Sequence, residues 1–308
     1  MSVLVLSARE VEELLPLEEC IEAMEAVLAA LARGELFQPL RTVVRPPDAE
    51  GLLGLMPAHR TGAGGSYALK EVVVVPGNPR RGLDAHQGAV LLHDGTTGEL
   101  QAILNASAIT AIRTAAVSAV ATRALARGDA RTVAILGSGV QGQAHARALR
   151  IVLRDPEIRV WSPSRGGSAE DVVRGADVVC TCTSSSTPVL RREWLAPGTH
   201  VNAVGSSIPA ARELDTATVA AAALFVDRRE SALHEAGDYL LAAADGAVGP
   251  DHIRAELGEV LVGAAVGRRD DQELTVFESL GLAVEDLAAA ELVVRTARER
   301  GVGTEVAF

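Results

Sequence analysis

The segment TVAILGSGVQGQAHARAL, residues 132–149, constrains the fold of this chain most strongly. A hydrophobic run that reads as a strand is followed by glycines at positions 137, 139 and 142 and then by helix-type sequence. In such a turn the first glycine permits a tight bend, the second lets a phosphate approach the backbone, and the third lets the helix pack on the strand. The helix N-terminus then faces the phosphate charge. The segment predicts a dinucleotide site, and the alternative is a tight turn without a ligand.

The chain on either side of this segment shows two different patterns. Downstream, RVWS, ADVVCTCT, HVNAVG and AALFVD read as strands separated by helical stretches, which indicates a parallel sheet with helices on its faces. Upstream, residues 8–34 have apolar residues at helical spacing, with Pro16 in a turn, and short strand-like runs then lead to a hairpin with the turn DGTTG. A long alanine-rich helix over residues 107–128 joins the two parts. The sequence therefore predicts an α/β protein.

Charge and composition argue against several classes of protein. The net charge of −11 comes from interspersed acidic and basic residues, whereas a nucleic-acid-binding protein usually carries a basic stripe. No uninterrupted apolar run is long enough to span a bilayer, and the N-terminus lacks the basic segment of a signal peptide. Cys20, Cys180 and Cys182 are too few for a disulfide framework, and Cys180 and Cys182 share one face of a predicted strand, which favours core packing. The histidines show no metal-ligand spacing. We expect a cytoplasmic protein without a metal.

The end of the strand after the glycine loop bears on which dinucleotide is bound. NAD sites usually place an acidic residue about 20 positions after the loop, against the ribose diol. Here that position is Ser162, in RVWSPSRGG, and Arg165 is close by. A missing acid and a nearby arginine suit the 2′-phosphate of NADP. We therefore predict NADP(H) as the favoured cofactor, with NAD(H) as the alternative.

Lys70, in GSYALKEVVVV, is the only lysine among 29 basic residues. A guanidinium stays protonated at any accessible pH, whereas burial can lower the pKa of an ammonium by several units, so that it exchanges a proton near neutrality. A lysine kept in an arginine-rich chain is thus a candidate acid or base. The alternative is an ordinary surface lysine at a chance position.

Arg113 lies on the predicted alanine-rich helix, and its helical neighbours are apolar or small: Ile109, Ala116, Val117 and Val120. A charge on an apolar face is costly unless it is paired. A substrate carboxylate would satisfy the guanidinium with two hydrogen bonds. An internal ion pair with an Asp or Glu would serve as well, and the sequence leaves both open.

Several segments, taken in order, resemble the ornithine cyclodeaminase/mu-crystallin family: LNASAITAIRTAAVSAVATRALAR, VAILGSGVQGQAHARAL, NAVGSSIPAARELD, ELGEVLVG and FESLGLAVEDLAAA. The resemblance covers nearly the whole chain. It implies a Rossmann-type dinucleotide-binding domain over residues 113–283, inserted into an α+β substrate-binding and dimerisation domain over 1–112 and 284–308. The family includes alanine dehydrogenases and ketimine or iminosuccinate-type imine reductases, and its members are typically homodimers.

The resemblance also implies roles for matching residues. Lys70 matches the family's catalytic lysine, and Arg41 and Arg113 look like the pair that holds the substrate carboxylate. Asp227 is a candidate polar partner in catalysis, and His86 either lines the pocket or is structural. With Ser162 and Arg165, the expected cofactor contacts are Thr114, Gly137, Ser138, Gly139, Val140, Gln141, Gly142, Thr183, Val204, Gly205, Ser279, Leu280 and Gly281.

The chain departs from the family in two places. Cyclodeaminases carry an aspartate after the strand HVNAVG, whereas residues 206–209 here read SSIP, without an acid, which speaks against ornithine cyclisation. The segment between RVWS and ADVVCTCT is also short, where the family usually has another helix and strand. We therefore expect a trimmed sheet with a more open adenine pocket.

These observations predict an NAD(P)H-dependent oxidoreductase that reduces a small α-imino acid to an amino acid, or catalyses the reverse dehydrogenation. Arg41 and Arg113 would hold the carboxylate, and Lys70 would exchange the proton. One alternative is a cyclodeaminase that releases ammonia without net redox change. The other is a non-catalytic ligand-binding protein, as some mu-crystallins are described.

Overall fold

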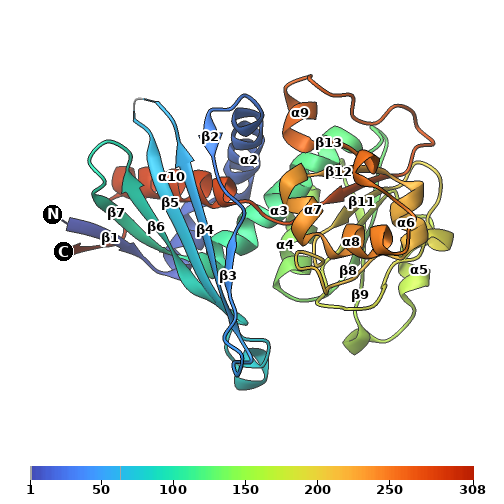
Figure 1. The fold of residues 1–308 in the computed structure, drawn as a ribbon, viewed down its shortest axis with the longest axis horizontal. Coiled ribbons are helices and arrows are strands. Elements are labelled where there is room, and N and C mark those ends of the chain that lie inside the picture. The colour runs from blue at the N-terminus through green and yellow to red at the C-terminus, as the bar shows by residue number, and fades with distance from the viewer. Residues whose placement is uncertain (1, 63) are drawn as a thin grey trace. The chain divides into compact units, whose positions relative to one another are not determined.

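The computed structural model describes residues 2–62 and 64–308, and the chain divides into two units. Unit 1 contains Met1–Arg113 and Leu282–Phe308, and unit 2 contains Thr114–Gly281. These boundaries lie one and two residues away from the expected ones at 112/113 and 283/284. Figure 1 shows the elements of both units, with the N-terminal strands and the last helix in unit 1.

Unit 1 is built on an eight-stranded sheet with the strand order β15-β1-β7-β6-β5-β4-β2, and β3 also pairs with β4 (Figure 1). The strands are β1 (Ser2–Leu6), β2 (Leu36–Phe37), β3 (Thr42–Val44), β4 (Leu52–Arg60), β5 (Ser66–Val74), β6 (His86–Asp94), β7 (Leu100–Asn105) and β15 (Thr304–Ala307). Strands β4 to β7 run antiparallel in sequence order. The predicted hairpin joins β6 to β7, and the Asp94 carboxylate accepts hydrogen bonds from the N–H groups of Thr96 and Thr97 within its turn.

Helix α10 (Ala283–Arg300) covers strands β4, β5 and β6 and packs against α2 (Leu17–Ala32). Helix α1 (Ala8–Leu14) precedes α2 and begins with a capping box between Ser7 and Glu10. Pro16 is the N-cap of α2, so the helical region predicted over residues 8–34 is divided at this proline. A short 3-10 helix, η1 (Asn78–Arg81), follows β5. The first turn of α10 is buried, and this brings acidic side chains into the interior of unit 1.

Helix α3 (Ala106–Leu125) is the predicted alanine-rich helix, and it carries the chain from unit 1 into unit 2. By length and composition it is apolar enough to cross a membrane. However, 78% of its most apolar window is buried inside the protein. Together with the ion pairs of Arg113 on its first half, this burial identifies α3 as a core helix.

Unit 2 contains a seven-stranded parallel sheet with the order β13-β12-β14-β11-β10-β8-β9. Its strands are β8 (Thr132–Leu136), β9 (Glu157–Trp161), β10 (Val178–Thr181), β11 (His200–Ala203), β12 (Ala223–Val226), β13 (Ile253–Glu256) and β14 (Thr275–Glu278). Strand β9 stands at one end of the order, where it pairs with β8. Between β9 and β10 the chain forms a 3-10 helix, η2 (Pro163–Arg165), and the short α5 (Ala169–Val173). The sheet therefore ends at β9 on this side, and the trimming expected relative to the family stays a prediction.

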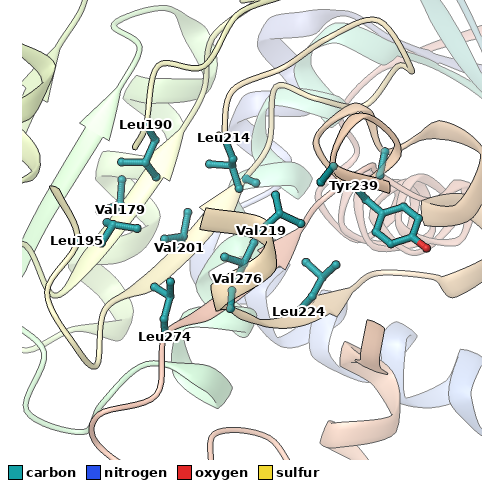
Figure 2. Packing of buried hydrophobic residues seen from close by; sticks show 14 of the residues in the cluster. Val179, Leu190, Leu195, Val201, Leu214, Val219, Leu224, Tyr239, Leu274 and Val276 are labelled. Atoms are coloured by element: carbon teal, nitrogen blue, oxygen red, sulfur yellow. The ribbon is translucent and has the colours of Figure 1, made fainter. Parts of the chain in front are cut away.

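The helices of unit 2 cover this sheet as expected for a doubly wound α/β domain. They are α4 (Val140–Val152), α5, α6 (Thr216–Ala221), α7 (Arg229–Glu235), α8 (Gly237–Ala244) and α9 (Leu257–Leu261), with η3 (Arg192–Trp194) and η4 (Pro250–His252). Figure 2 shows part of the core, in which Val179, Val201 and Val276 from neighbouring strands lie among leucines from the connecting segments. The predicted packing of Cys180 and Cys182 is also confirmed, since both belong to one core cluster.

Candidate substrate and cofactor sites

Lys70 lies in the middle of strand β5, between Met56 of β4 and Val90 of β6. The residue is only 3% exposed, so it is not an ordinary surface lysine. Its Nζ forms an ion pair of 2.7 Å with Oδ2 of Asp286. Burial lowers the pKa of Lys70 to about 8; the charge of Asp286 opposes this shift, and the charges of Arg113 and Arg41 add to it. The ammonium can therefore exchange a proton near neutral pH.

Arg113 has internal partners, the second of the two situations that the sequence left open. Its Nε donates to Oδ1 of Asp286 at 3.1 Å, and its Nη1 donates to Oε2 of Glu285 at 2.8 Å. Both acids lie in the buried first turn of α10, where the helix dipole favours negative charge. Asp286 thus bridges the only lysine and the buried arginine.

Sequence reasoning missed Glu285 and Asp286. The sequence did contain an indication of their role, because both acids stand in an otherwise apolar segment, GLAVEDLAAA. A buried acid needs a buried partner as much as the buried Arg113 does. However, Arg113 and Asp286 are 173 positions apart, so nothing local indicated that they pair.

The structure also brings Arg41 and His86 near this group. Arg41 directly precedes β3 and is half-buried, and its charge acts on Lys70. His86 is the first residue of β6, and its backbone carbonyl accepts a hydrogen bond from Oγ of Ser107. Partial desolvation, with the charges of Lys70 and Arg113, lowers the pKa of His86 against the opposing charge of Asp84. Unit 1 thus combines a titratable ammonium with guanidinium groups, which can attract an anion and transfer a proton.

The glycine loop of unit 2 has the geometry that a dinucleotide needs. Gly137 has φ of 124°, and a Cβ there would lie 2.3 Å from the carbonyl oxygen of Cys182. A Cβ on Gly142 would lie 2.0 Å from the carbonyl oxygen of Gly137. Gly139 is the N-cap of α4, so this helix begins without a side chain over its first N–H groups. The loop therefore has the close strand–helix turn that a dinucleotide site requires, and its role in binding the pyrophosphate stays a prediction.

The position expected to choose between the nucleotides follows β9. Ser162 is 5% exposed, and its Oγ lies 2.9 Å from Oγ of Ser138 in the glycine loop and 3.0 Å from Oγ of Ser164. Arg165 ends η2 and is exposed. This edge thus presents hydroxyl groups and a guanidinium in the place where an NAD site usually has a carboxylate.

The remaining predicted cofactor residues follow strands β10, β11 and β14, at the carboxyl edge of the parallel sheet. Thr183 and Gly205 share one buried acid, Glu213, which sequence reasoning also missed. Val204 and Ser279 are largely buried, and Ser279 N–H donates to the carbonyl of Ala203. Of the other three residues, Thr114 is buried on α3, Val140 is exposed at the start of α4, and Gln141 follows it and is half-buried. In open α/β sheets ligands bind at this edge.

Asp227 belongs to unit 2, while Lys70 belongs to unit 1. Oδ2 of Asp227 accepts hydrogen bonds from the N–H groups of Leu280 and Gly281 at 2.7 and 2.8 Å. Oδ1 of Asp227 accepts a hydrogen bond from Arg228 N–H. The structure therefore gives Asp227 a part in holding the turn after β14, in addition to the catalytic role that the resemblance implies.

Comparison with known proteins agrees with this geometry. The family model of the ornithine cyclodeaminase/mu-crystallin family matches residues 1–167 and 164–301. Ketimine reductase mu-crystallin from Mus musculus is 41% identical, over 94% of this chain and 95% of the relative.

Two solved structures are also similar. Delta(1)-pyrroline-2-carboxylate reductase from Thermococcus litoralis, in complex with NADH and L-proline, has a TM-score of 0.95 at 34% identity and covers 99% of this chain and 100% of its own. An archaeal alanine dehydrogenase dimer with bound NAD has a TM-score of 0.93 at 32% identity and covers 100% of both chains. The predicted activity is the kind named for these proteins, and the predicted α/β fold is confirmed. The chain belongs to the ornithine cyclodeaminase/mu-crystallin family.

Proposed function

We propose that this protein is an NAD(P)H-dependent oxidoreductase that reduces a small α-imino acid, a ketimine, to the amino acid, or catalyses the reverse dehydrogenation. The observation that carries the proposal is the buried Lys70, whose pKa of about 8 lies near physiological pH. Its ion pair with Asp286 fixes its position, and Arg113 is held beside it by the same carboxylate. A group in this state is suited to general acid or base catalysis.

The roles of the unit 1 residues follow from their charges. Arg41 and Arg113 attract the carboxylate of the substrate, and the two ion pairs of Arg113 fix the orientation of its guanidinium. His86 lines the same pocket. In imine reduction the Lys70 ammonium gives its proton to the nitrogen of the C=N bond while the carbon receives hydride, so the products are an amine and a neutral Lys70. The reduced nicotinamide supplies that hydride when it is bound.

Unit 2 provides the nucleotide site in this proposal. The 137–142 loop would hold the pyrophosphate, and Thr114, Thr183, Val204, Gly205 and the Ser279–Gly281 turn would provide further contacts to the dinucleotide. NADP(H) is preferred over NAD(H), because Ser138, Ser162 and Arg165 suit a 2′-phosphate better than a free ribose diol. NAD(H) is the alternative, since two similar solved structures contain NADH and NAD.

Two further expectations belong to the same proposal. The protein is a homodimer, as the archaeal alanine dehydrogenase is, and this can be measured by light scattering. It acts in the cytoplasm, which suits its three free cysteines, Cys20, Cys180 and Cys182.

The test is a spectrophotometric screen with both reduced cofactors. The panel contains Δ1-pyrroline-2-carboxylate, as a preformed cyclic imine, and 2-oxo acids mixed with ammonia or methylamine, which form open-chain imines. Stoichiometric oxidation of NADPH or NADH with a member of the panel supports the proposal. Ammonia release from L-ornithine with catalytic NAD and no net redox change would instead identify a cyclodeaminase. Cofactor binding without turnover on the whole panel contradicts an enzymatic function.

A further inference from the structure

Glu213 is a completely buried acid that the proposed reaction does not use. Its Oε1 accepts hydrogen bonds from N–H and Oγ1–H of Thr183, at 2.6 and 2.7 Å. Its Oε2 accepts a hydrogen bond of 2.6 Å from Gly205 N–H. Thr183 follows β10 and Gly205 follows β11, and these strands are neighbours in the parallel sheet. One carboxylate therefore ties together the two segments that leave the carboxyl edge of the sheet side by side.

Gly205 provides independent support for this close arrangement. A Cβ at Gly205 would lie 2.0 Å from the carbonyl oxygen of Thr183 and 2.6 Å from Cδ of Glu213, so only glycine fits against the carboxylate. The carbonyl oxygen of the neighbouring Cys182 would lie 2.3 Å from a Cβ on Gly137, at the start of the glycine loop. The glycine loop, the segment after β10 and the segment after β11 are thus packed in series, with Glu213 holding the last two.

We propose, on the basis of the function proposed above, that Glu213 is a positioning residue for the cofactor and that the protein binds its dinucleotide well only when this carboxylate is ionised. An ionised carboxylate accepts all three hydrogen bonds. A protonated carboxyl group carries an O–H on one oxygen, and it is a weaker hydrogen-bond acceptor than a carboxylate. The hydrogen bonds from Gly205 and Thr183 then weaken, and Glu213 holds the segments after β10 and β11 together less tightly.

The surroundings of Glu213 place its ionisation in the range of physiological pH. Burial raises the pKa of Glu213 to about 7, against the hydrogen bonds from Thr183 and Thr181, and the charge of Asp238 raises it further. Asp238, on α8, accepts hydrogen bonds from the backbone N–H groups of Glu213 and Leu214.

Other titratable groups lie around Glu213 and Asp238. Burial raises the pKa of Glu278 on β14 well above its usual range, and the charges of Asp238, Glu213 and Asp227 raise it further. The groups that act on Glu213 or on its acidic neighbours are Asp238, Glu278, Asp227, Cys180, Cys182 and Arg212. Burial keeps both thiols protonated, since it raises the pKa of Cys180 to about 12 and that of Cys182 well above its usual value. Asp238 is therefore the neighbour through which the titration of Glu213 can be shifted.

The test measures the dissociation constant of NADH by fluorescence titration from roughly pH 6 to pH 9, because NADH lacks the 2′-phosphate, whose own pKa is about 6. For the wild-type protein the dissociation constant should rise about tenfold for each pH unit below the pKa of Glu213, because only the ionised fraction binds. Glu213→Gln should bind NADH at least about tenfold more weakly at high pH, with no pH dependence in this range.

Asp238→Asn is the matched control. Its amide oxygen still accepts from the N–H groups of Glu213 and Leu214, but the negative charge is gone. The pKa of Glu213 should fall, so the pH dependence of NADH binding should move to lower pH while the dissociation constant at high pH stays unchanged. A role in folding alone does not move this midpoint, and circular dichroism checks that both variants are folded.

The outcomes separate this inference from the proposed function. Wild-type NADH binding that is independent of pH, or Glu213→Gln binding with the wild-type profile, overturns the inference alone. A wild-type protein that binds neither NADH nor NADPH overturns the proposed function and this inference together. If NADH binding follows the expected profile but no imino acid is reduced, the inference stands and the proposed reaction falls.

Discussion

The two units bury their charged groups in opposite ways. In unit 1 two buried cations, Lys70 and Arg113, share two buried acids, Glu285 and Asp286, and the pairs lie at 2.7 to 3.1 Å. In unit 2 the buried acids Glu213, Asp227 and Asp238 accept hydrogen bonds from backbone N–H groups.

This difference sets how each region responds to change. An ion pair compensates both charges, so removing either partner leaves an isolated charge in the interior, which is strongly destabilising. A carboxylate held by N–H groups has no cation to compensate its charge, so burial raises its pKa, and a second carboxylate nearby raises it further, as Asp238 does for Glu213. In unit 1 the carboxylate of Asp286 instead opposes the effect of burial on the pKa of Lys70, so loss of a partner is the larger perturbation there.

The largest expected effect is on turnover. Lys70→Arg keeps the positive charge and the ion pair with Asp286, but a guanidinium does not release its proton. We expect turnover to fall about 10²- to 10⁴-fold, while the dissociation constant for NADH stays unchanged. The control is Arg60→Lys. This variant also replaces one basic residue by the other, at Arg60 on β4 of the same sheet, where the side chain pairs with Glu291 of α10. Near-wild-type turnover of Lys70→Arg would refute the catalytic role.

Arg113→Gln tests the paired character of unit 1. The substitution leaves Glu285 without its cation and Asp286 with Lys70 alone, so the free energy of unfolding should fall by about 3–5 kcal/mol. Arg174→Gln removes the exposed ion pair with Glu170 and should cost less than about 1 kcal/mol. Urea unfolding measures both. Equal losses for the two variants would mean that the buried network is no more important than a surface pair.

Asp286→Asn should change the pH dependence of imine reduction. The reaction uses the ammonium form of Lys70, so kcat/KM should decrease as pH rises through the pKa of about 8. Asp286 raises that pKa, and its removal should move the decrease to lower pH by about 1 unit or more. If kcat/KM of Asp286→Asn decreased at the same pH as in the wild type, the decrease would report the titration of a group other than Lys70.

The smallest effect concerns the choice of nucleotide. Ser162→Asp places a carboxylate beside Ser138, where it can bind a ribose diol and repel a 2′-phosphate. The ratio of the dissociation constants for NADH and NADPH should shift about tenfold in favour of NADH, which corresponds to about 1.4 kcal/mol. A wild-type protein that already prefers NADH tenfold would contradict the proposed NADP(H) preference.

Local patterns in the chain were sufficient for several features. The strand, the three glycines and the helix of residues 132–149 lie next to each other, and steric limits on a tight turn make their conformation predictable. The alternation of strands and helices after this segment likewise predicted a parallel sheet, which the structure contains. Lys70 stood out because it is the only lysine among 29 basic residues. Arg113 stood out because a charge among apolar residues needs a partner.

The partners of these residues were not predictable in the same way. Arg113 left a substrate carboxylate and an internal acid equally open, and only the fold put the first turn of α10 against α3 and β5. Glu213 stands in the segment RELD, where its side chain had no apparent partner until β10 and β11 were aligned as neighbours.

The sequence by itself determined which residues carry unusual chemistry: the single lysine, the buried arginine, the glycine turn and the missing acid at Ser162. These follow from side-chain type and short-range sterics, which act within a few residues. The tertiary structure alone decided which carboxylates meet them and which pKa values shift, because hydrogen bonds, burial and charge depend on distances between residues that lie far apart in the chain.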